Sequence, residues 1–500
     1  MCFVNSGCPN HLGDCDNSQF FYFDRMTTTT KPLSFQNQLD KSNITRPMWM
    51  LWILSAGLIA LDGFDFFIIG VAMPFIRLDF GLDAAQTGAI AVAAVAGALV
   101  GSGTLGPITD RIGRQRMLAI DVAIFIVASA ASALAWNATS LIIFRFLVGV
   151  GIGADYPISV SYITENVPSR FRGRMVVSAF SFQAVGALLG AIVGFSVMEI
   201  YNHLYPESVE AIVSYGWRWM LGVGVLFAVL IGWLRLSFAI ESPLYYIAKG
   251  NYQAASEAAT QILTYPIAIT PETNPPEETP SLSYKALFSP EYRRRTILAS
   301  VPWFLQDIAT YGIGIFTPTI IAAIAFTEDT HLMVREIAAA KGAAFVDVFL
   351  IVGFLLAIAS IERFGRIKLQ IVGFFGMAAG LLMLSGAGGE LEGGPPNLVL
   401  LFGGFIVFNV MMNMGPNSTT FLLSGEVFST AIRASGAGFA AAVAKAGAVV
   451  GTFGLPIVQH ALGVSNLLVV LASICLVAAL ITYLFRVETG GRVFEGDGMG

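Results

Sequence analysis

Apolar runs of membrane-spanning length recur along the chain, with short polar loops between them. A bilayer core of about 30 Å takes about 20 helical residues to cross, so each such run predicts a transmembrane helix. On this measure we expect twelve spans, at residues 50–73, 86–107, 117–136, 139–162, 175–198, 217–238, 296–325, 343–361, 369–387, 397–414, 431–456 and 464–485. The pattern predicts an all-α integral membrane protein.

Glycine spacing inside these runs indicates close helix packing. Gly97 and Gly101, for example, lie four residues apart within one predicted span. Lipid tails provide no hydrophobic force that would draw helices together, so small residues that let two backbones approach must hold them.

Composition agrees with a protein surrounded by lipid. The 500 residues are 55% hydrophobic and 12% charged, whereas soluble proteins carry about 25% charged residues. The net charge of −5 indicates no particular partner, and we expect no nucleic acid ligand. Cysteines and histidines form no metal-binding spacing, so we expect no metal and no cofactor.

Positive charge alternates from loop to loop. Lys and Arg gather after the second, fourth, sixth, eighth and tenth spans, at Arg111, Arg114, Arg116, Arg170, Arg172, Arg174, Lys249, Lys285, Arg293–Arg295, Arg363, Arg366, Lys368 and Arg433. Loops rich in Lys and Arg stay in the cytoplasm. We therefore expect a multi-pass protein of the plasma (inner) membrane with both termini in the cytoplasm.

The chain divides into two halves that resemble each other. A polar connection at 239–295 separates six spans at 50–238 from six at 296–485, with tails at 1–49 and 486–500. Its proline-rich stretch predicts a flexible linker without a folded module. Met1–Arg25 has no periodicity, and we expect the native chain to begin at Met26. Repeated halves are typical of secondary transporters.

Ionisable side chains inside the predicted spans are few. They are Asp62, Asp65, Asp121, Asp155, Asp307, Asp347 and Lys445. A charge at the bilayer centre costs at least about 2.5–3.5 kcal/mol, so such groups normally face a partner or a wet cavity and mark the path of a solute or proton. The alternative is a fixed ion pair, such as Lys445 with one of the aspartates, that only locks two helices.

Charged motifs repeat after matching spans of the two halves. The first half carries Asp110, Arg111, Gly113, Arg114, Glu165 and Arg172, and the second carries Glu362, Arg363, Gly365, Arg366, Glu426 and Arg433. Arginines there can bond helix-end carbonyls and neighbouring acids, which would latch a cytoplasmic gate. The simpler interpretation is an anchor that follows the positive-inside rule.

A glycine-rich run in the fourth span suggests transport driven by a gradient. Gly149 to Pro157 lies inside an apolar helix, follows no strand and lacks the Gly-Lys-Ser/Thr of a phosphate loop. The run Gly151–Ser159, with Glu165, resembles the signature of phosphate:proton symporters in the major facilitator superfamily. Two further parts of the chain agree with this resemblance: Trp303–Asp307 with Tyr311–Gly312, and Gly415–Phe421 with Gly425–Phe428. These symporters usually have a second glycine where this chain has Ala154. In that respect the run is more similar to bacterial metabolite carriers of the sugar-porter branch.

The resemblance implies a fold, a set of site residues and a mechanism. The fold would be twelve helices in two pseudo-symmetric six-helix bundles. Residues implied to contact the substrate are Tyr156, Gln183, Trp303, Asp307, Tyr311 and Asn417. Those implied to serve proton coupling are Asp62, Asp65, Asp155 and Lys445.

Three functions are compatible with the chain. The first is proton-coupled uptake of inorganic phosphate by alternating access, and the second is a carrier of a sugar or organic anion. A membrane sensor on a transporter scaffold belongs to a different class, and a linker without a folded module disfavours it. No nucleophile or metal constellation suggests an enzyme. We expect a monomer that interacts with its solute, protons and the lipid bilayer.

Overall fold

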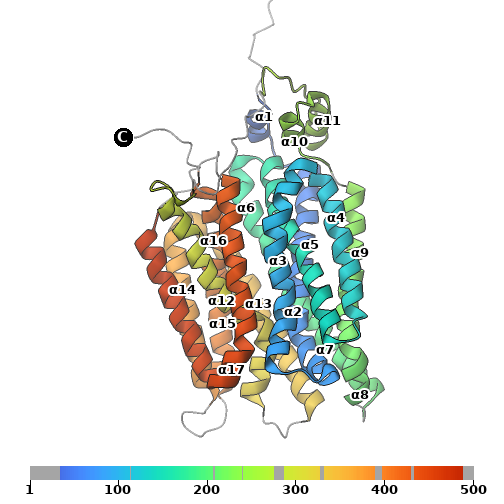
Figure 1. The fold of residues 1–500 in the computed structure, drawn as a ribbon. Helices are drawn as coiled ribbons and strands as arrows, with labels where there is room; N and C mark the ends of the chain where they lie inside the picture. Colours follow the sequence, from blue (N-terminus) through green and yellow to red (C-terminus); the bar gives the residue numbers. More distant parts are fainter. Residues whose placement is uncertain are drawn as a thin grey trace, which may run out of the picture.

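The computed structural model describes residues 34–112, 114–206, 209–238, 240–274, 287–326, 331–388, 397–428 and 433–487, and the regular elements in these ranges are all helical. The Met1–Arg25 segment and the tail after residue 487 therefore lie outside the described part. The remaining chain confirms the expected all-α class (Figure 1).

The two halves form two bundles (Figure 1). The first contains α2 (Arg46–Phe80), α3 (Ala84–Ile112), α4 (Arg114–Ala133), α5 (Ala138–Asn166), α6 (Ser169–Phe180), α7 (Phe182–Leu204), α8 (Val209–Ala211) and α9 (Trp217–Phe238). The second contains α12 (Arg293–Ala325), α13 (Leu332–Phe364), α14 (Arg366–Ser385), α15 (Leu398–Met414), α16 (Pro416–Glu426) and α17 (Arg433–Phe485). The bundles meet where α7 packs on α13, α3 on α17 and α2 on α12.

The helices coincide with the predicted spans. Nine helical stretches of the described chain are long and apolar enough to cross a membrane, and Ala119–Ala133 and Ala138–Gly153 are shorter apolar helices. The longest element, α17, has a kink at Gly463, where φ is 80°, so it corresponds to the last two predicted spans. The arrangement is consistent with twelve spans.

Glycines set the helix crossings in the first bundle, as their spacing predicts. A Cβ on Gly149 of α5 would lie 1.8 Å from the carbonyl oxygen of Ala94 on α3. Gly153 would place one 2.3 Å from the oxygen of Ala98 in the same way. Gly97 of α3 would in turn place a Cβ 2.0 Å from the oxygen of Phe146. No side chain fits between these backbones.

The linker contains a folded module, so the expectation of a flexible linker is wrong for residues 240–274. Its helices α10 (Pro243–Ala248) and α11 (Tyr252–Leu263) pack on the short α1 (Phe35–Lys41). Apolar side chains spaced for one helix face form this core, namely Phe35, Leu39, Met48, Ile247, Ala255, Ala259, Ile262, Leu263, Ile267 and Ile269. We call this module the cap. Most of the proline-rich stretch lies outside the described residues.

Polar contacts hold the cap on the first bundle. Within the cap itself, the Asn274 side chain accepts the N–H of Phe35 at 3.0 Å. The Asp40 carboxylate accepts the N–H and the hydroxyl of Ser169, at the start of α6, at 2.9 and 2.7 Å. Partial burial raises the pKa of Asp40, but the bonds from Ser169 and Gln36 and the nearby charge of Arg172 together lower it below its ordinary value. Its carboxylate is therefore ionised at neutral pH.

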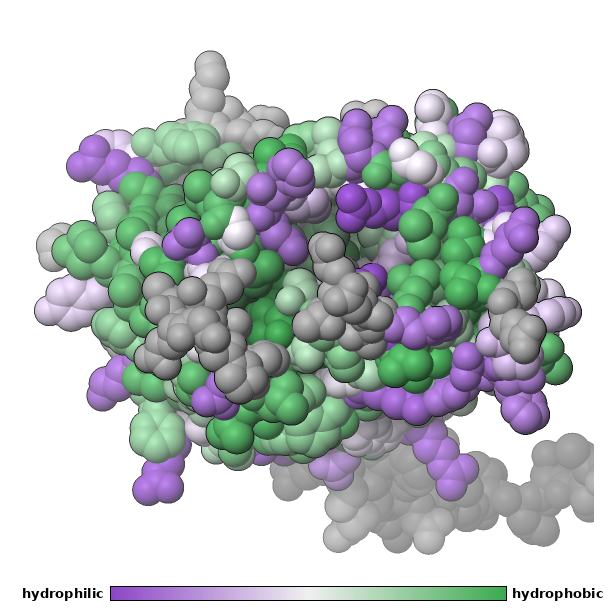
Figure 2. Space-filling view, turned by 90° about the horizontal axis from the view of Figure 1, so that it is seen from below, coloured by the Kyte–Doolittle hydropathy of each residue, from purple (hydrophilic) through white to green (hydrophobic). Residues whose placement is uncertain are grey.

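The opposite end of the molecule carries no such module in the part of the chain that the structure describes. Viewed from that side, hydrophilic residues are mixed with apolar ones over the end face (Figure 2). By contrast, many large apolar side chains stay exposed, among them Val127, Leu226, Trp233, Leu355 and Val399. Lipid rather than water suits such a surface.

The Gly149 contact yields a stability prediction. Gly149→Ala would force a methyl group into the backbone of α3, so we expect it to cost about 1–3 kcal/mol, which is usual for overpacking. Gly222→Ala on α9 is the control, because a Cβ added there would meet nothing within 4 Å and alanine favours a helix. Thermal melting of the purified protein in detergent measures both. Equal melting temperatures would contradict tight packing of α3 on α5.

Candidate functional site

A cavity lies between the two bundles. Its free volume is about 30 Å³, which is room for about two water molecules. Its walls are Phe67, Gln183, Ala184, Ala187, Trp303, Asp307, Thr310, Tyr311, Leu350, Phe354, Met412, Asn413, Asn417, Phe421 and Lys445. The first bundle thus contributes α2 and α7, and the second contributes α12, α13, α15, α16 and α17.

Aromatic and backbone contacts close the cavity on both sides. Toward the cap, the rings of Phe180 on α6 and Phe421 on α16 lie 4.1 Å apart between centroids. Toward the other end, Gly70 of α2 packs so closely on α12 that a Cβ there would lie 1.7 Å from the oxygen of Ile315. Both contacts join one bundle to the other, so either must break for the cavity to open on that side.

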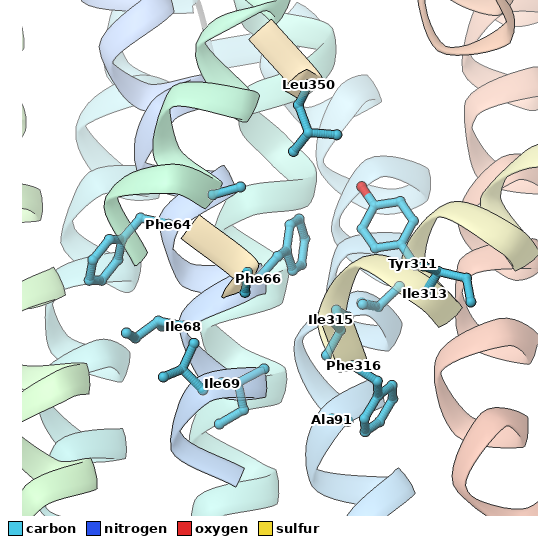
Figure 3. Packing of buried hydrophobic residues seen from close by; sticks show 14 of the residues in the cluster. Phe64, Phe66, Ile68, Ile69, Ala91, Tyr311, Ile313, Ile315, Phe316 and Leu350 are labelled. Carbon is cyan, nitrogen blue, oxygen red and sulfur yellow. The ribbon is translucent and has the colours of Figure 1, made fainter. Parts of the chain in front are cut away.

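A charged group stands in the wall formed by α12 and α17. The Lys445 ammonium donates to the Tyr311 hydroxyl at 2.7 Å and lies 3.5 Å from the Asp307 carboxylate. Asp307 is 2% exposed and Lys445 7%. The two helices can approach because Gly447 and Gly451 of α17 lie against the backbone of α12. Phe66 of α2 faces the Tyr311 ring from the first bundle, edge-on at 5.6 Å (Figure 3).

Amides form the second polar wall. α15 ends at Met414 and α16 begins at Pro416, and this break carries Asn417 into the cavity. The Asn417 amide donates to Asn413 at 2.7 Å and accepts from Gln306 at 3.1 Å. Gln183 of α7 donates to the Tyr311 hydroxyl at 3.4 Å. The site therefore presents hydroxyl and amide groups from both bundles around one ion pair.

Most of the residues implied by the resemblance meet here. Gln183, Trp303, Asp307, Tyr311, Asn417 and Lys445 all line the cavity. The Tyr156 and Asp155 side chains lie outside the described part, although α5 carries both residues. Gln306, Thr310 and Asn413 were not singled out from the sequence. The signal that could have found them is that each is a polar residue inside an apolar span.

Asp65 lies elsewhere, in a buried ion pair. Its carboxylate accepts from the Arg145 guanidinium of α5 at 2.7 Å, and a second Arg145 N–H reaches the Asp65 backbone oxygen at 3.0 Å. Arg145 is 1% exposed. The sequence analysis did not identify Arg145 as a functional residue. A single arginine inside the apolar run 139–162 is the signal that could have found it. Such a residue in hydrocarbon needs a partner.

Asp62 lies in a third place. With Asp121 it lines a small pocket inside the first bundle, whose other walls are Leu58, Leu61, Val122, Phe125, Ile152 and Ala228. The site for proton coupling implied by the resemblance is thus divided: Lys445 at the cavity, Asp65 with Arg145, and Asp62 with Asp121. Their roles in coupling remain predictions.

The predicted gate residues are only partly described. Arg366 and Glu426 form an ion pair at 3.2 Å, mostly buried, between α14 and α16. The Glu165 carboxylate accepts the hydroxyl of Ser242 next to the cap, and Gly365 ends α13 with φ of 81°, which favours glycine. Arg172 is partly buried and Arg363 exposed. Gly113, and the side chains of Asp110, Arg111, Arg114, Glu362 and Arg433, lie outside the described residues.

Comparison with known proteins shows which family the chain resembles. The family model described as "Sugar (and other) transporter" matches residues 49–496. A probable inorganic phosphate transporter 1-6 of Arabidopsis thaliana is 29% identical over 473 residues, which cover 87% of this chain and 90% of that protein. The putative metabolite transport protein YaaU of Escherichia coli is also 29% identical, covering 86% of this chain and 90% of its own.

A solved structure shares the fold. The xylose transporter XylE from E. coli, in a partially occluded inward-open conformation, superposes with a TM-score of 0.70 at 19% identity. The superposition covers 88% of this chain and 100% of that one. The two-bundle arrangement is therefore the major facilitator fold.

The Lys445–Asp307 pair yields a second stability prediction. Lys445→Ala leaves Asp307 buried without its cation, so we expect a loss of about 3–5 kcal/mol. Adding Asp307→Asn should restore part of it, because the unpaired charge is then removed. The control is Lys341→Ala, since the Lys341–Glu199 pair is 51% and 45% exposed and surface pairs contribute about 0–1 kcal/mol. Thermal melting of the purified variants measures both effects. Equal melting temperatures of Lys445→Ala and Lys341→Ala would contradict the proposed energetic importance of the cavity pair.

Proposed function

Because the chain belongs to the sugar (and other) transporter family, we propose that it carries inorganic phosphate together with protons across the membrane by alternating access. The observation that carries this proposal is the cavity between the bundles with a lysine–aspartate pair in its wall. The relatives named as inorganic phosphate transporters support the choice of anion.

The chemistry of the cavity favours a partly protonated phosphate. Lys445 and the amides of Gln183 and Asn417 supply N–H donors, which oxyanions need. Asp307 offsets the charge of Lys445, so a fully ionised anion would meet a carboxylate as well. A phosphate that retains a proton can donate it in a hydrogen bond to Asp307. The pair therefore selects an anion that is both acceptor and donor.

A sugar is the second candidate. Amides beside an aromatic ring also suit hydroxyl groups, and the structural neighbour is a proton:xylose symporter. The cation at Lys445 favours an anion over a neutral sugar, because a buried ammonium that gains an anionic ligand gains a charge-assisted bond. Competition between the two classes of solute decides this question directly.

We assign proton exchange to two buried sites with acidic side chains in the first bundle. Asp65 can alternate between the Arg145 ion pair and a protonated state in which Arg145 is released. Asp62 and Asp121 share one small pocket, where two carboxylates are more stable when a proton neutralises one of them. These groups lie outside the cavity lining, so substrate and proton need not compete for the same atoms.

We propose that the side with the cap faces the cytoplasm, in the plasma (inner) membrane. The lysines and arginines of that side follow the positive-inside rule. Each half contributes walls to the cavity, so one copy of the chain is sufficient for the proposed site.

Uptake into proteoliposomes tests the function and the role of Asp307. Labelled phosphate should accumulate when the outside is acidic, with sulfate and xylose competing poorly. In Asp307→Asn, sulfate should compete at least about tenfold better relative to phosphate, because the repelling carboxylate is gone and the bond from phosphate loses its charge assistance; a difference of about 1.4 kcal/mol corresponds to that factor. Xylose uptake without phosphate uptake would instead favour the second candidate. No uptake of either would refute both.

The role of Asp65 is tested by separating coupling from exchange. Asp65→Asn stays neutral, so we expect accumulation driven by a pH gradient to fall at least about tenfold. Phosphate–phosphate exchange at equal pH should remain within about twofold of wild type. Gly222→Ala on α9, where an added Cβ meets nothing within 4 Å, should change neither rate. Loss of exchange together with accumulation would mean that Asp65 acts on binding or folding instead.

A further inference from the structure

One buried acid of the second bundle has no role in the cavity site. Asp347 lies near the middle of α13 and is 6% exposed. It makes no hydrogen bond or ion pair with any other residue that the structure describes. An isolated carboxylate in apolar surroundings is costly unless a proton, a cation or a donor neutralises it.

Asp347 lies on the face of α13 that leads to the cavity. Leu350 and Phe354 follow it by three and seven residues, which is the spacing of one helix face, and both line the cavity. Figure 3 shows Leu350 extending toward the space between the bundles. The chain runs from the end opposite the cap toward the cap along α13, so Asp347 is about one turn beyond the cavity on the side away from the cap.

The surroundings of Asp347 offer no cation among the described residues. α13 packs mainly on α7, α15 and α12, with smaller contacts to α14, α6 and α2. The part of α7 from Ala187 to Gly194 has no ionisable side chain, and neither does any of α15.

Several charged groups of these helices have partners other than Asp347. They pair as Glu199 with Lys341, Asp307 and Tyr311 with Lys445, Asp65 with Arg145, and Arg366 with Glu426. The α6 arginines belong to the cap side, where Arg170 donates to the backbone oxygen of Ser42. A bound metal ion would need several oxygen ligands, and no group of three or more His, Cys, Asp or Glu occurs in the described chain. A proton, by contrast, needs only one carboxylate oxygen to bind.

We propose that Asp347 is a further proton-binding site of the carrier, loaded while α7 and α13 are packed together and unloaded when they separate. Opening of the cavity on the side away from the cap would bring water to this face, where the carboxyl group releases its proton. Closing the bundles again requires it to regain a proton. The idea rests on the proposed transport function, since it assumes that α7 and α13 part during the cycle.

Asp347→Asn tests this site, with Glu336→Gln as its matched control. Glu336 lies three turns away on the same face of α13 and is held by Arg335 at 3.0 Å. In proteoliposomes, a pH dye and labelled phosphate together give the protons moved per phosphate. We expect Asp347→Asn to lower this ratio by about one while exchange at equal pH persists, and Glu336→Gln to leave it unchanged. An unchanged ratio in Asp347→Asn would overturn the proposal.

A second measurement does not depend on the substrate. Infrared spectra of the purified protein should contain the carbonyl stretch of a protonated carboxyl group that is absent from Asp347→Asn, and from Asp347→Leu if the amide variant folds poorly. The same band should remain in Glu336→Gln. If wild type carries no phosphate but the band is lost as expected, the transport proposal fails and the buried protonated acid stands. If the band persists without Asp347, the site is wrong.

Discussion

The energetic cost of a charge in hydrocarbon controls where the ionisable groups of this protein lie. Two buried charges of the described chain find their counterparts on another helix: Arg145 pairs with Asp65 and Lys445 with Asp307. Breaking such a pair by protonation of the acid leaves the other charge to bear the same cost. A carrier can use that cost to couple a proton to a change of conformation.

Close backbone packing makes the pairs possible. A lysine side chain reaches Asp307 because glycines let α17 lie directly on α12, and glycines bring α3 and α5 together in the same way. Within each bundle this packing leaves little freedom. Between the bundles, the contact of Phe180 with Phe421 on the cap side involves rings that can turn, whereas the contact of Gly70 with Ile315 on the other side joins two backbones. Rigid bundles that move against each other are the usual plan of alternating access.

The cap adds a feature that rigid-bundle motion must accommodate. It is built from the segment before α2 and the linker between the halves, yet its α1 end bonds to the first bundle, at Ser169 and Arg170. The linker therefore does more than tether the halves. A linker without a folded module had counted against a membrane sensor, and the cap removes that argument. The cavity and the family still favour a carrier.

The sequence by itself determined the membrane class, the positions of the spans and the two halves, because apolar length and charge in hydrocarbon are local, strong constraints. Its resemblance to a known family pointed to six of the cavity residues, namely Gln183, Trp303, Asp307, Tyr311, Asn417 and Lys445. Only the tertiary structure decided which acid meets which base. Asp65, Asp307 and Asp347 look alike along the chain, but one has an arginine, one a lysine and one no partner among the described residues. Pairing depends on helix rotation and crossing. The cap escaped prediction for the same reason: its core joins segments more than two hundred residues apart, as the bond of Phe35 to Asn274 illustrates.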